Sequence, residues 1–315
     1  MTSAAPFPDE ADAKGRFVRQ RSRFREWVSA DGSTPYPAAP GRYHLYVSYA
    51  CPWAHRSIIV RRLKGLEDAI GLTAVDPIRD ERGWRFNPDV DRCEADPVNG
   101  FRYLAEAYER TDPSFRGRVT VPVLWDRETG RIVNNESADV IRMLNSAFDE
   151  WAGDPGLDLY PQDLRGEIDA VNEYVYDNIN NGVYRAGFAA TQEAYEEAVT
   201  ALFEALDRVE ERLSGQRYLA GDRITEADWR LFTTLVRFDA VYVGHFKCNV
   251  RRIADYPSLS GFLRELYRWD GVAETVDFDH IKRHYYVTHR TINPTGIVPA
   301  GPALDLEAPH GRDAL

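Results

Sequence analysis

The segment YACPWAHRSIIVRRLKG, residues 49–65, constrains the fold of this 315-residue chain more than any other. Residues 42–49 alternate in side-chain character and are rich in aromatic and β-branched residues, which predicts a strand. The following residues have the apolar spacing of an amphipathic helix, with a buried face of Ile59, Leu63, Leu66 and Ile70 opposite Arg61, Arg62 and Lys64. Residues 71–78 form a second predicted strand, so a β-α-β unit with parallel strands is expected.

A cysteine stands where this predicted helix begins. Cys51 is expected at the N-cap with Pro52 as the first helical residue, so that its sulfur faces free backbone N–H groups and the positive end of the helix dipole. Such positions lower a cysteine pKa from ~8.5 to roughly 3.5–7.5, which predicts a nucleophilic thiolate. His55 and Arg56 add to this effect if they face the sulfur. The structural alternative is a small thiol that packs as an apolar residue.

Ala54 occupies the position where a dithiol enzyme carries its second cysteine. Without that cysteine, a mixed disulfide on Cys51 must be released by an external thiol, and glutathione is the abundant cytosolic candidate. The other cysteines, Cys93 and Cys248, are far away in sequence, and three cysteines do not make a disulfide framework. We interpret Cys93 as incidental rather than resolving, and we expect a reducing compartment.

The remaining chain completes two predicted domains. Residues 101–110 predict a short helix, and residues 118–148 predict a strand, a turn at 127–130, a strand and a helix, in a mixed sheet. Pro122 is expected at a strand start or in a cis turn. Beyond a Pro/Gly-containing linker the pattern is helical, and Thr225 with Asp228 predicts a capping box.

The predicted fold class is therefore α/β plus all-α, with an N-terminal domain of order βαβ then αββα and a helical C-terminal domain. The length accommodates two cores. The expected divisions are an N-terminal arm (1–41), the α/β domain (42–148), a linker (149–160), the helical domain (161–285) and a C-terminal tail (286–315).

Composition limits the partners. A net charge of −11 without a basic block argues against nucleic acid, and apolar runs far shorter than the ~20 residues of a bilayer span argue against a membrane. The N-terminus lacks the apolar core of a secretory signal, so the cytoplasm is expected. His245 with Cys248, and His280 with His284, have spacings that could hold zinc, but no supporting ligand set is evident, so no metal is expected.

Several strings in this order resemble one family, the glutathionyl-hydroquinone reductases, or Xi class of glutathione transferases. They are CPWAHR, GWRF, RVTVPVLWD, NNESADVIRML, INNGVYRAGFA and HYYVTHRTINPTGIVPAGP, and the likeness runs from about residue 17 to 303. The resemblance implies a thioredoxin-like N-terminal domain, a glutathione-transferase-type helical C-terminal domain, a substrate cleft between them, and a homodimer formed through the helical domain.

The resemblance also implies the reaction and its residues. Cys51 is the expected nucleophile, attacking the sulfur of a glutathionyl-hydroquinone, after which a second glutathione releases the enzyme-bound one as glutathione disulfide. Tyr184 and Tyr285 are expected to bind the quinol hydroxyls or assist proton transfer. Glutathione itself is expected to contact Trp84, Arg118, Val121 beside Pro122, and Glu136 with Ser137 at a helix start.

Two other functions are compatible with parts of this sequence pattern. An omega-like glutathione transferase, acting as a thioltransferase or dehydroascorbate reductase, shares the single thiol and the fold but has no need of paired tyrosines. A non-catalytic interaction domain of the transferase fold tolerates loss of the thiol, so the presence of Cys51 together with its glutathione-binding set argues against it.

Overall fold

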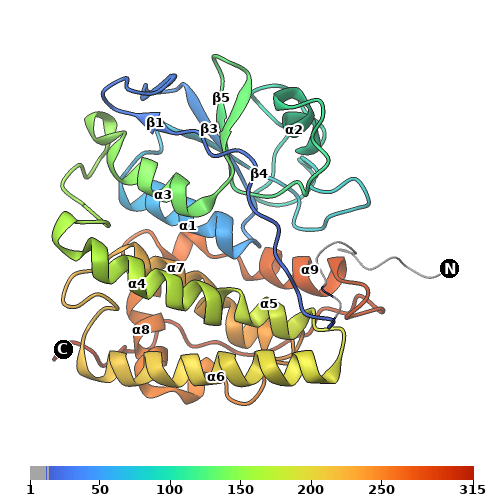
Figure 1. Cartoon of the computed structure of the whole chain (residues 1–315), viewed down its shortest axis with the longest axis vertical. Helices are drawn as coiled ribbons and strands as arrows, with labels where there is room; N and C mark the ends of the chain where they lie inside the picture. The colour runs from blue at the N-terminus through green and yellow to red at the C-terminus, as the bar shows by residue number, and fades with distance from the viewer. Residues whose placement is uncertain (1–11, 13) are drawn as a thin grey trace. The chain divides into compact units, whose positions relative to one another are not determined.

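The computed structural model describes residue 12 and residues 14–315, which form two compact units. The sheet unit consists of Arg21–Asp158 and Glu274–His284. The helical unit consists of the described residues up to Gln20, together with Leu159–Ala273 and Tyr285–Leu315. Part of the predicted N-terminal arm, residues 1–11 and 13, lies outside the described residues. Figure 1 shows the helices and strands of the chain.

A mixed four-stranded sheet forms the centre of the sheet unit. Its strands lie in the order β4-β3-β5-β6, with the bounds β3 Tyr43–Val47, β4 Gly71–Ala74, β5 Val123–Asp126 and β6 Arg131–Asn134. Strands β3 and β4 are parallel, whereas β5 is antiparallel to both β3 and β6. Every residue of β3 and β5 is buried, as expected for central strands. The mixed sheet predicted from the sequence is confirmed.

Three helices accompany this sheet: α1 Pro52–Leu63, α2 Ala105–Thr111 and α3 Ser137–Ser146. Helix α1 connects the parallel strands β3 and β4, so the predicted β-α-β unit is confirmed. Helices α1 and α3 lie side by side (Figure 1), and α2 packs against β6. The Val121–Pro122 peptide bond is cis and immediately precedes β5, and residues 127–130 turn the chain from β5 into β6.

The end of α1 differs from the prediction. Lys64, which we expected on the exposed face, is fully buried, and its Nζ lies 2.7 Å from Asp149 and 2.8 Å from the Leu157 carbonyl oxygen. The helical period fails here because the chain turns at Gly65, which has a φ of +61°. A Cβ at that position would come within 2.9 Å of the Gly153 backbone, so the turn lets residues 149–158 pack over the helix end and pair the buried ammonium.

The predicted boundary between arm and α/β domain, at residues 41 and 42, is not where the structure divides. Residues from Arg21 onward belong to the sheet unit, because their backbone runs along the open edge of β6. Glu26 donates its N–H to Val133, and the Phe24 carbonyl accepts from Asn135. This pairing covers an edge that otherwise exposes unpaired backbone groups. Two short strands, β1 Val28–Ser29 and β2 Tyr36–Pro37, follow in the same segment.

The second difference concerns residues 274–284, which the sequence analysis assigned to the helical domain and which belong to the sheet unit. Arg92 donates to the Glu274 carbonyl at 2.7 Å, and His280 lies 2.9 Å from the Asp91 carbonyl. These contacts attach the segment to the long polar loop that follows β4. Helix α9, Phe278–Thr288, therefore contributes its residues up to His284 to one unit and its later residues to the other.

The helical unit is built from five further α-helices, two π-helical segments and short 3₁₀ turns. The α-helices are α4 Arg165–Val175, α5 Gly182–Gly187, α6 Gln192–Gly215, α7 Glu226–Arg237 and α8 Pro257–Tyr267. The π-helical segments are η4 Tyr176–Asn180 and η5 Phe238–Tyr242. The 3₁₀ turns among the described residues are η2 Asp149–Trp151, η3 Gln162–Leu164, η6 Ile253–Asp255 and η7 Ala273–Thr275. Every residue of α7 is buried, which makes it the central helix of this unit.

Helix α7 begins with the capping box predicted from Thr225 and Asp228. The Asp228 carboxylate accepts hydrogen bonds from the N–H groups of Thr225 and Leu219, both at 2.8 Å. The carboxyl group is wholly buried, and burial raises its pKa to about 6 even though these hydrogen bonds act in the opposite direction.

Because the pKa of Asp228 is higher in the folded chain than the ordinary value of 3.8, the folded state binds this proton more tightly than the unfolded state does. The contribution of Asp228 to stability is therefore largest below pH 4 and decreases as the pH rises through 6. We expect the free energy of unfolding of the wild type, relative to Asp228→Asn, to fall by about 2–3 kcal/mol between pH 4 and pH 7. Denaturant unfolding at several pH values measures this difference, and a difference independent of pH would contradict the assignment.

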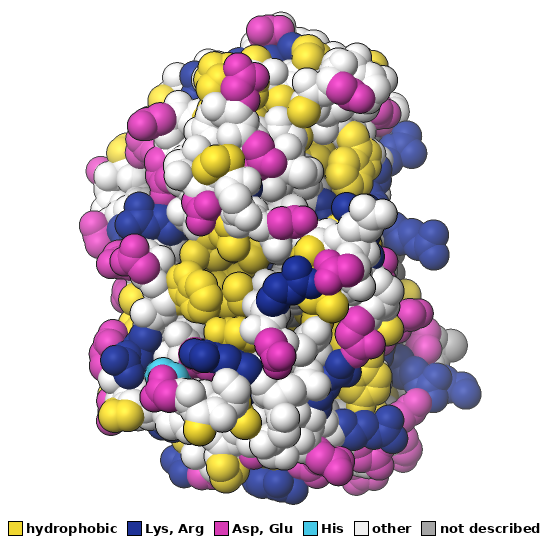
Figure 2. All heavy atoms as spheres, turned by 90° about the vertical axis from the view of Figure 1, so that its left-hand side faces the viewer, with side chains coloured by type: hydrophobic (Ala, Val, Ile, Leu, Met, Phe, Trp, Pro, Cys, Tyr) yellow, Lys and Arg dark blue, Asp and Glu magenta, His cyan; other side chains and the backbone are white. Residues whose placement is uncertain are grey.

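On the face shown in Figure 2, Lys and Arg side chains are interspersed with Asp and Glu, and neither sign covers a large continuous area. Among the helices of the described chain, none has both the length and the apolar character to cross a bilayer.

Candidate functional site

Cys51 occupies the N-cap of α1, and Pro52 is the first helical residue, as predicted. The thiol is partly exposed, and its Sγ lies 3.7 Å from the carbonyl oxygen of Val121. No side chain forms a capping hydrogen bond at this helix start, Pro52 has no N–H, and the His55 N–H donates to the Cys51 carbonyl at 3.0 Å. The N-terminus of a helix is, in general, the positive end of its dipole.

The neighbours of Cys51 in the first turn have hydrogen-bond partners other than the thiol. His55 is fully buried, and its Nε2 lies 2.8 Å from Thr275 Oγ1. Arg56 is also buried, donates to Ser137 Oγ at 3.4 Å and places its guanidinium 4.5 Å from the Trp53 ring. Arg56 therefore links the start of α1 to the start of α3.

The other two cysteines are in different environments. Burial raises the pKa of the Cys93 thiol to about 12, and that thiol donates to the Val75 carbonyl at 3.3 Å. Burial also raises the pKa of Cys248, which is almost completely enclosed. Both therefore remain protonated thiols at neutral pH, and all three cysteines are free.

Val121 presents backbone groups beside the thiol. Its carbonyl faces Cys51, and its N–H has no hydrogen-bond acceptor among the residues that the structure describes. The cis bond to Pro122 follows directly. An unpaired N–H and a carbonyl at a strand start form one edge on which an extended peptide can add.

Glu136 and Ser137 open helix α3. Glu136 is the N-cap and accepts a hydrogen bond from Ala138 N at 3.2 Å, while Ser137 is the first helical residue. The Glu136 carboxylate also accepts from Ser22 Oγ at 2.9 Å. The sequence analysis missed Ser22, because it assigned that residue to an irregular arm. Only the pairing of this arm with β6 brings the hydroxyl to the helix start.

Trp84 and Arg118 lie in two loops of the same unit. Trp84 is largely buried and stacks on His284 with ring centroids 5.1 Å apart and an interplanar angle of 17°. His284 Nδ1 lies 2.6 Å from the Pro77 carbonyl, which fixes the imidazole under the indole. Arg118 is half-buried in the segment between α2 and β5.

Tyr184 and Tyr285, which are 101 residues apart in sequence, meet in the helical unit. Their hydroxyl oxygens are 2.6 Å apart, and the Tyr285 hydroxyl is also 3.0 Å from that of Tyr242. Burial raises the pKa of both Tyr242 and Tyr285 well above the ordinary value. These phenols stay protonated at neutral pH and can act as hydrogen-bond donors. The three residues, Tyr184, Tyr242 and Tyr285, are the tyrosine trio below.

Sequence reasoning did not find Tyr242, because in a chain with 17 tyrosines its local sequence carries no signal. The structure does contain a signal for Tyr242, in its backbone conformation. Tyr242 lies in the π-helical segment η5, and the π-helical segment η4 shortly precedes Tyr184. Such segments are frequent at functional sites. The trio also has a cation beside it, because the Arg19 guanidinium lies 4.9 Å from the centre of the Tyr184 ring.

The histidine pairs considered for zinc have other partners. His245 Nε2 lies 3.2 Å from His289 Nδ1, and burial lowers the pKa of His245 to about 4. His280 and His284 each face a backbone carbonyl. In the described part of the chain, no three His, Cys, Asp or Glu side chains gather in a way that could hold a metal ion.

The structure thus gathers the predicted residues into two groups. Cys51 and Val121 lie side by side, and Glu136 and Ser137 share a helix start, within the sheet unit, which also holds Trp84 and Arg118. Tyr184 and Tyr285 meet in the helical unit. The two groups differ in chemistry: the first contains a partly exposed thiol, and the second contains hydrogen-bonded phenolic hydroxyls.

Comparison with known proteins identifies the family. Residues 50–147 match the glutathione S-transferase N-terminal domain, and residues 192–265 match the glutathione S-transferase C-terminal domain. Glutathionyl-hydroquinone reductase YqjG of Escherichia coli is 53% identical over 97% of this chain and 94% of its own length. Glutathionyl-hydroquinone reductase PcpF of Sphingobium chlorophenolicum is 54% identical over 95% of this chain and 93% of its own length.

Solved structures agree with this assignment. The glutathione-bound structure of YqjG superposes with a TM-score of 0.90 at 53% identity, covering 92% of this chain and 96% of that one. A Xi-class glutathione transferase from Natrialba magadii superposes with a TM-score of 0.91 at 54% identity, covering 93% of this chain and 89% of that one. The thioredoxin-like domain followed by a helical transferase domain is therefore confirmed as the fold class. This chain belongs to the Xi class of glutathione transferases, the glutathionyl-hydroquinone reductase family.

Proposed function

We propose that this chain reduces S-glutathionyl-hydroquinones to hydroquinones with glutathione as the reductant. The observation that carries the proposal is the position of Cys51 at the start of α1, with an exposed backbone edge beside it and Ala54 in place of a resolving cysteine. Curated relatives that align over almost the whole chain bear the name glutathionyl-hydroquinone reductase, and a related structure contains glutathione.

The first step forms a mixed disulfide. The Cys51 thiolate attacks the sulfur of the glutathionyl-hydroquinone, a sulfur–sulfur bond forms, and the sulfur–carbon bond breaks. The electron pair of the broken bond remains on the ring carbon, which takes up a proton to give the hydroquinone. A second glutathione thiolate then attacks the glutathionyl sulfur, releasing glutathione disulfide and restoring the Cys51 thiolate. In sum, the thioether sulfur of the substrate and the thiol of the second glutathione are oxidised to one disulfide, and one aryl carbon is reduced.

The tyrosine trio supplies the proton in this proposal. An aryl carbanion is a poor leaving group, so carbon–sulfur cleavage needs general acid assistance at the ring carbon, directly or after ketonisation of the hydroquinone. The pKa of Tyr285 is raised by burial, so its hydroxyl carries a proton at neutral pH. Its hydrogen bonds to two further hydroxyls allow that proton to be replaced.

Glutathione is held, in this proposal, by the residues of the sheet unit. The Val121 N–H and carbonyl pair with the cysteinyl backbone of the tripeptide, as in an added strand. The first amides of α3 and the Ser137 hydroxyl bind the γ-glutamyl carboxylate, and Glu136 binds its ammonium. Trp84 covers the tripeptide, and Arg118 binds one of its carboxylates.

Glu136→Gln tests the binding assignment. The amide keeps an oxygen that can accept from Ala138 N, so the helix cap is preserved while the negative charge is removed. We expect the KM for glutathione to rise by about five- to tenfold, because a charge-assisted hydrogen bond is lost. Ser22→Ala, which removes only the hydroxyl bonded to Glu136, is the matched control with a smaller effect. Steady-state kinetics at varied glutathione concentration measure this KM, and an unchanged KM in Glu136→Gln would contradict the assignment of Glu136 to glutathione binding.

The function itself is tested by comparing two substrates. Purified protein with glutathione is assayed on glutathionyl-hydroquinone and on dehydroascorbate, the substrate of the omega-like alternative. We expect kcat/KM for the glutathionyl-hydroquinone to exceed that for dehydroascorbate by at least about 100-fold, because only the former uses an aryl-protonating group. The reverse preference would overturn the proposal in favour of a thioltransferase.

We further propose that the chain acts in the cytoplasm, where glutathione keeps thiols reduced, and as a homodimer formed through its helical domain. Three free cysteines suit a reducing compartment. The dimer rests on family likeness, and light scattering of the purified chain tests it, since a monomeric mass at working concentration would contradict it.

A further inference from the structure

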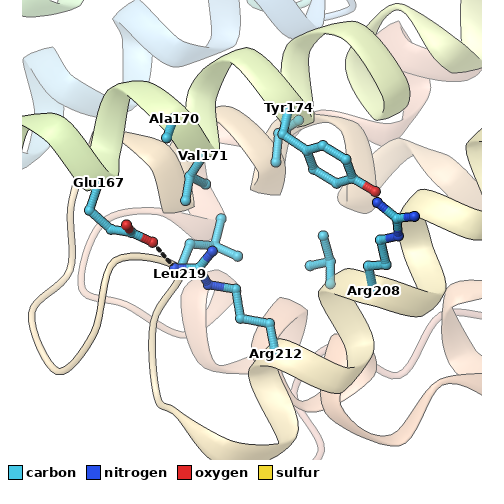
Figure 3. Close-up of a pocket in the computed structure, with 9 residues that line it drawn as sticks. Glu167, Ala170, Val171, Tyr174, Arg208, Arg212 and Leu219 are labelled. Carbon is cyan, nitrogen blue, oxygen red and sulfur yellow. Dashed lines mark hydrogen bonds and ion pairs between the residues drawn. The ribbon is translucent and has the colours of Figure 1, made fainter.

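A cavity of about 390 Å³ lies between helices α4 and α6 of the helical unit, and none of its lining residues belongs to the tyrosine trio. Its floor is apolar and well packed: Val171, Val175, Val209 and Leu219 are all buried. Figure 3 shows the side chains of both helices lining the space. Cavities that hold small organic ligands start at about 300 Å³ and are mostly apolar with a few polar groups, so size and lining are both suitable.

The polar groups of this cavity lie at its two ends. At one end Arg212 forms an ion pair with Glu167, drawn as a dashed line in Figure 3. At the other end Arg208 projects beside Tyr174, with its guanidinium 5.9 Å from the centre of the phenol ring. Among the residues that the structure describes, Arg208 has no carboxylate within ion-pair distance, and Arg212 Nε has no hydrogen-bond acceptor.

The charges of the cavity sum to one uncompensated positive charge, because Glu167 neutralises Arg212 and leaves Arg208. A cation at the edge of an apolar floor, beside an aromatic ring, complements a ligand with one negative charge and a flat apolar body. A second negative charge on the ligand would meet the Glu167 carboxylate at the far end and be disfavoured.

We propose that the α4–α6 cavity binds a small aryl-alkyl carboxylate or a monoanion of the same kind. The apolar body rests on the four buried aliphatic side chains and against Tyr174, and the carboxylate pairs with Arg208. The site is independent of the proposed reductase reaction, because none of its residues belongs to the thiol, glutathione or tyrosine groups described above.

The first experiment titrates 3-phenylpropionate into the full-length protein by isothermal titration calorimetry, with glutathione present at saturation so that its own site is occupied. We expect one saturable site with a Kd of roughly a millimolar or below. The neutral analogue 3-phenylpropanol should bind at least about fivefold more weakly, because it cannot pair with Arg208. Absence of saturable binding of 3-phenylpropionate, or equal binding of both compounds, would overturn the proposal.

Variants locate the binding. Arg208→Gln should weaken binding of 3-phenylpropionate at least about fivefold, and Ala170→Trp, which fills the cavity from an exposed position on its rim, should abolish it. Arg165→Gln is the matched control, because Arg165 is an exposed arginine of α4 that does not line the cavity and should leave the Kd unchanged.

Reductase turnover separates this proposal from the proposed function. Both cavity variants should keep wild-type kcat and KM for glutathionyl-hydroquinone, so their loss of binding is not a loss of the fold. Binding that survives Arg208→Gln and Ala170→Trp lies elsewhere on the molecule and refutes the site. A second copy of the chain seated on this face is the other occupant to exclude. If Ala170→Trp converts a dimer to a monomer and the wild type shows no binding, the cavity belongs to a subunit interface and the proposal fails.

Discussion

Replacing Cys51 by serine is expected to lower turnover of glutathionyl-hydroquinone by about 10³-fold or more. A serine hydroxyl at the N-cap of α1 is protonated at neutral pH and cannot form the mixed disulfide, so the covalent route is lost entirely. Serine is a preferred N-cap residue, so the helix start is preserved and the thermal midpoint should change little. The measurement is steady-state release of hydroquinone by purified wild type and variant.

The matched control is Cys93→Ser. Cys93 is the other partly exposed cysteine, and burial holds its pKa near 12, so it contributes little thiolate at neutral pH. Its replacement should leave turnover within about twofold of wild type. Near wild-type turnover in Cys51→Ser would refute the thiol mechanism, and a large loss in Cys93→Ser would make Cys93 a resolving cysteine, contrary to its interpretation here.

Replacing Tyr285 by phenylalanine is the prediction with the next largest effect. The variant loses the central hydroxyl of the tyrosine trio, to which both Tyr184 and Tyr242 are hydrogen-bonded. General acid catalysis typically contributes 10²–10⁴-fold, so we expect kcat for glutathionyl-hydroquinone to fall by about 10²-fold or more. The KM for glutathione should be unchanged, because the proposed tripeptide contacts lie in the sheet unit.

A substrate whose reduction needs no proton at a carbon atom distinguishes a role of Tyr285 in proton transfer from a role in the structure. Tyr285→Phe should reduce a glutathionyl mixed disulfide at close to the wild-type rate, since only a sulfur–sulfur bond is exchanged. Tyr286→Phe is the matched control: this neighbour contacts the Ala240 carbonyl at 3.5 Å and is not part of the trio, so its kcat should be retained. Equal losses on both kinds of substrate would show that Tyr285 supports the structure rather than the proton transfer.

Much of the fold follows from local sequence signals that each have one physical meaning. Pro52 after Cys51 marks a helix start, and the structure places the N-cap there. Pro122 cannot donate to a sheet ladder, and it stands immediately before β5. The Thr225 and Asp228 pair predicts a capping box because both side chains act within one helical turn, and that box is present.

The features that the sequence analysis missed depend on contacts between distant segments. Lys64 looked exposed because helical periodicity describes only its own helix, whereas the segment after α3 covers it. Residues 21–41 lack a strong strand pattern, and part of this segment belongs to the sheet unit because its backbone pairs with the open edge of β6. Tyr242 and Tyr285 meet only through a side-chain contact between two segments of the helical unit that are far apart in sequence. No local pattern encodes these three contacts.

The residues of the candidate site also differ in how they could be predicted. Cys51 was predicted from the residues alone, because cysteines at the start of a helix are often nucleophilic. The tyrosines and the glutathione contacts came from family resemblance, and the structure now brings Tyr184 to Tyr285 and Val121 to Cys51. Their catalytic and binding roles remain proposals that the variants above address.

The most direct test of the account is to identify the covalent intermediate. Wild-type protein is mixed with one equivalent of glutathionyl-hydroquinone in the absence of free glutathione, and the products are analysed by peptide mass spectrometry and by hydroquinone release. We expect about one equivalent of hydroquinone and one glutathionyl group on the peptide that contains Cys51, removable by added glutathione. Hydroquinone release without any protein adduct, or an adduct on Cys93 or Cys248 instead, would contradict the thiol mechanism.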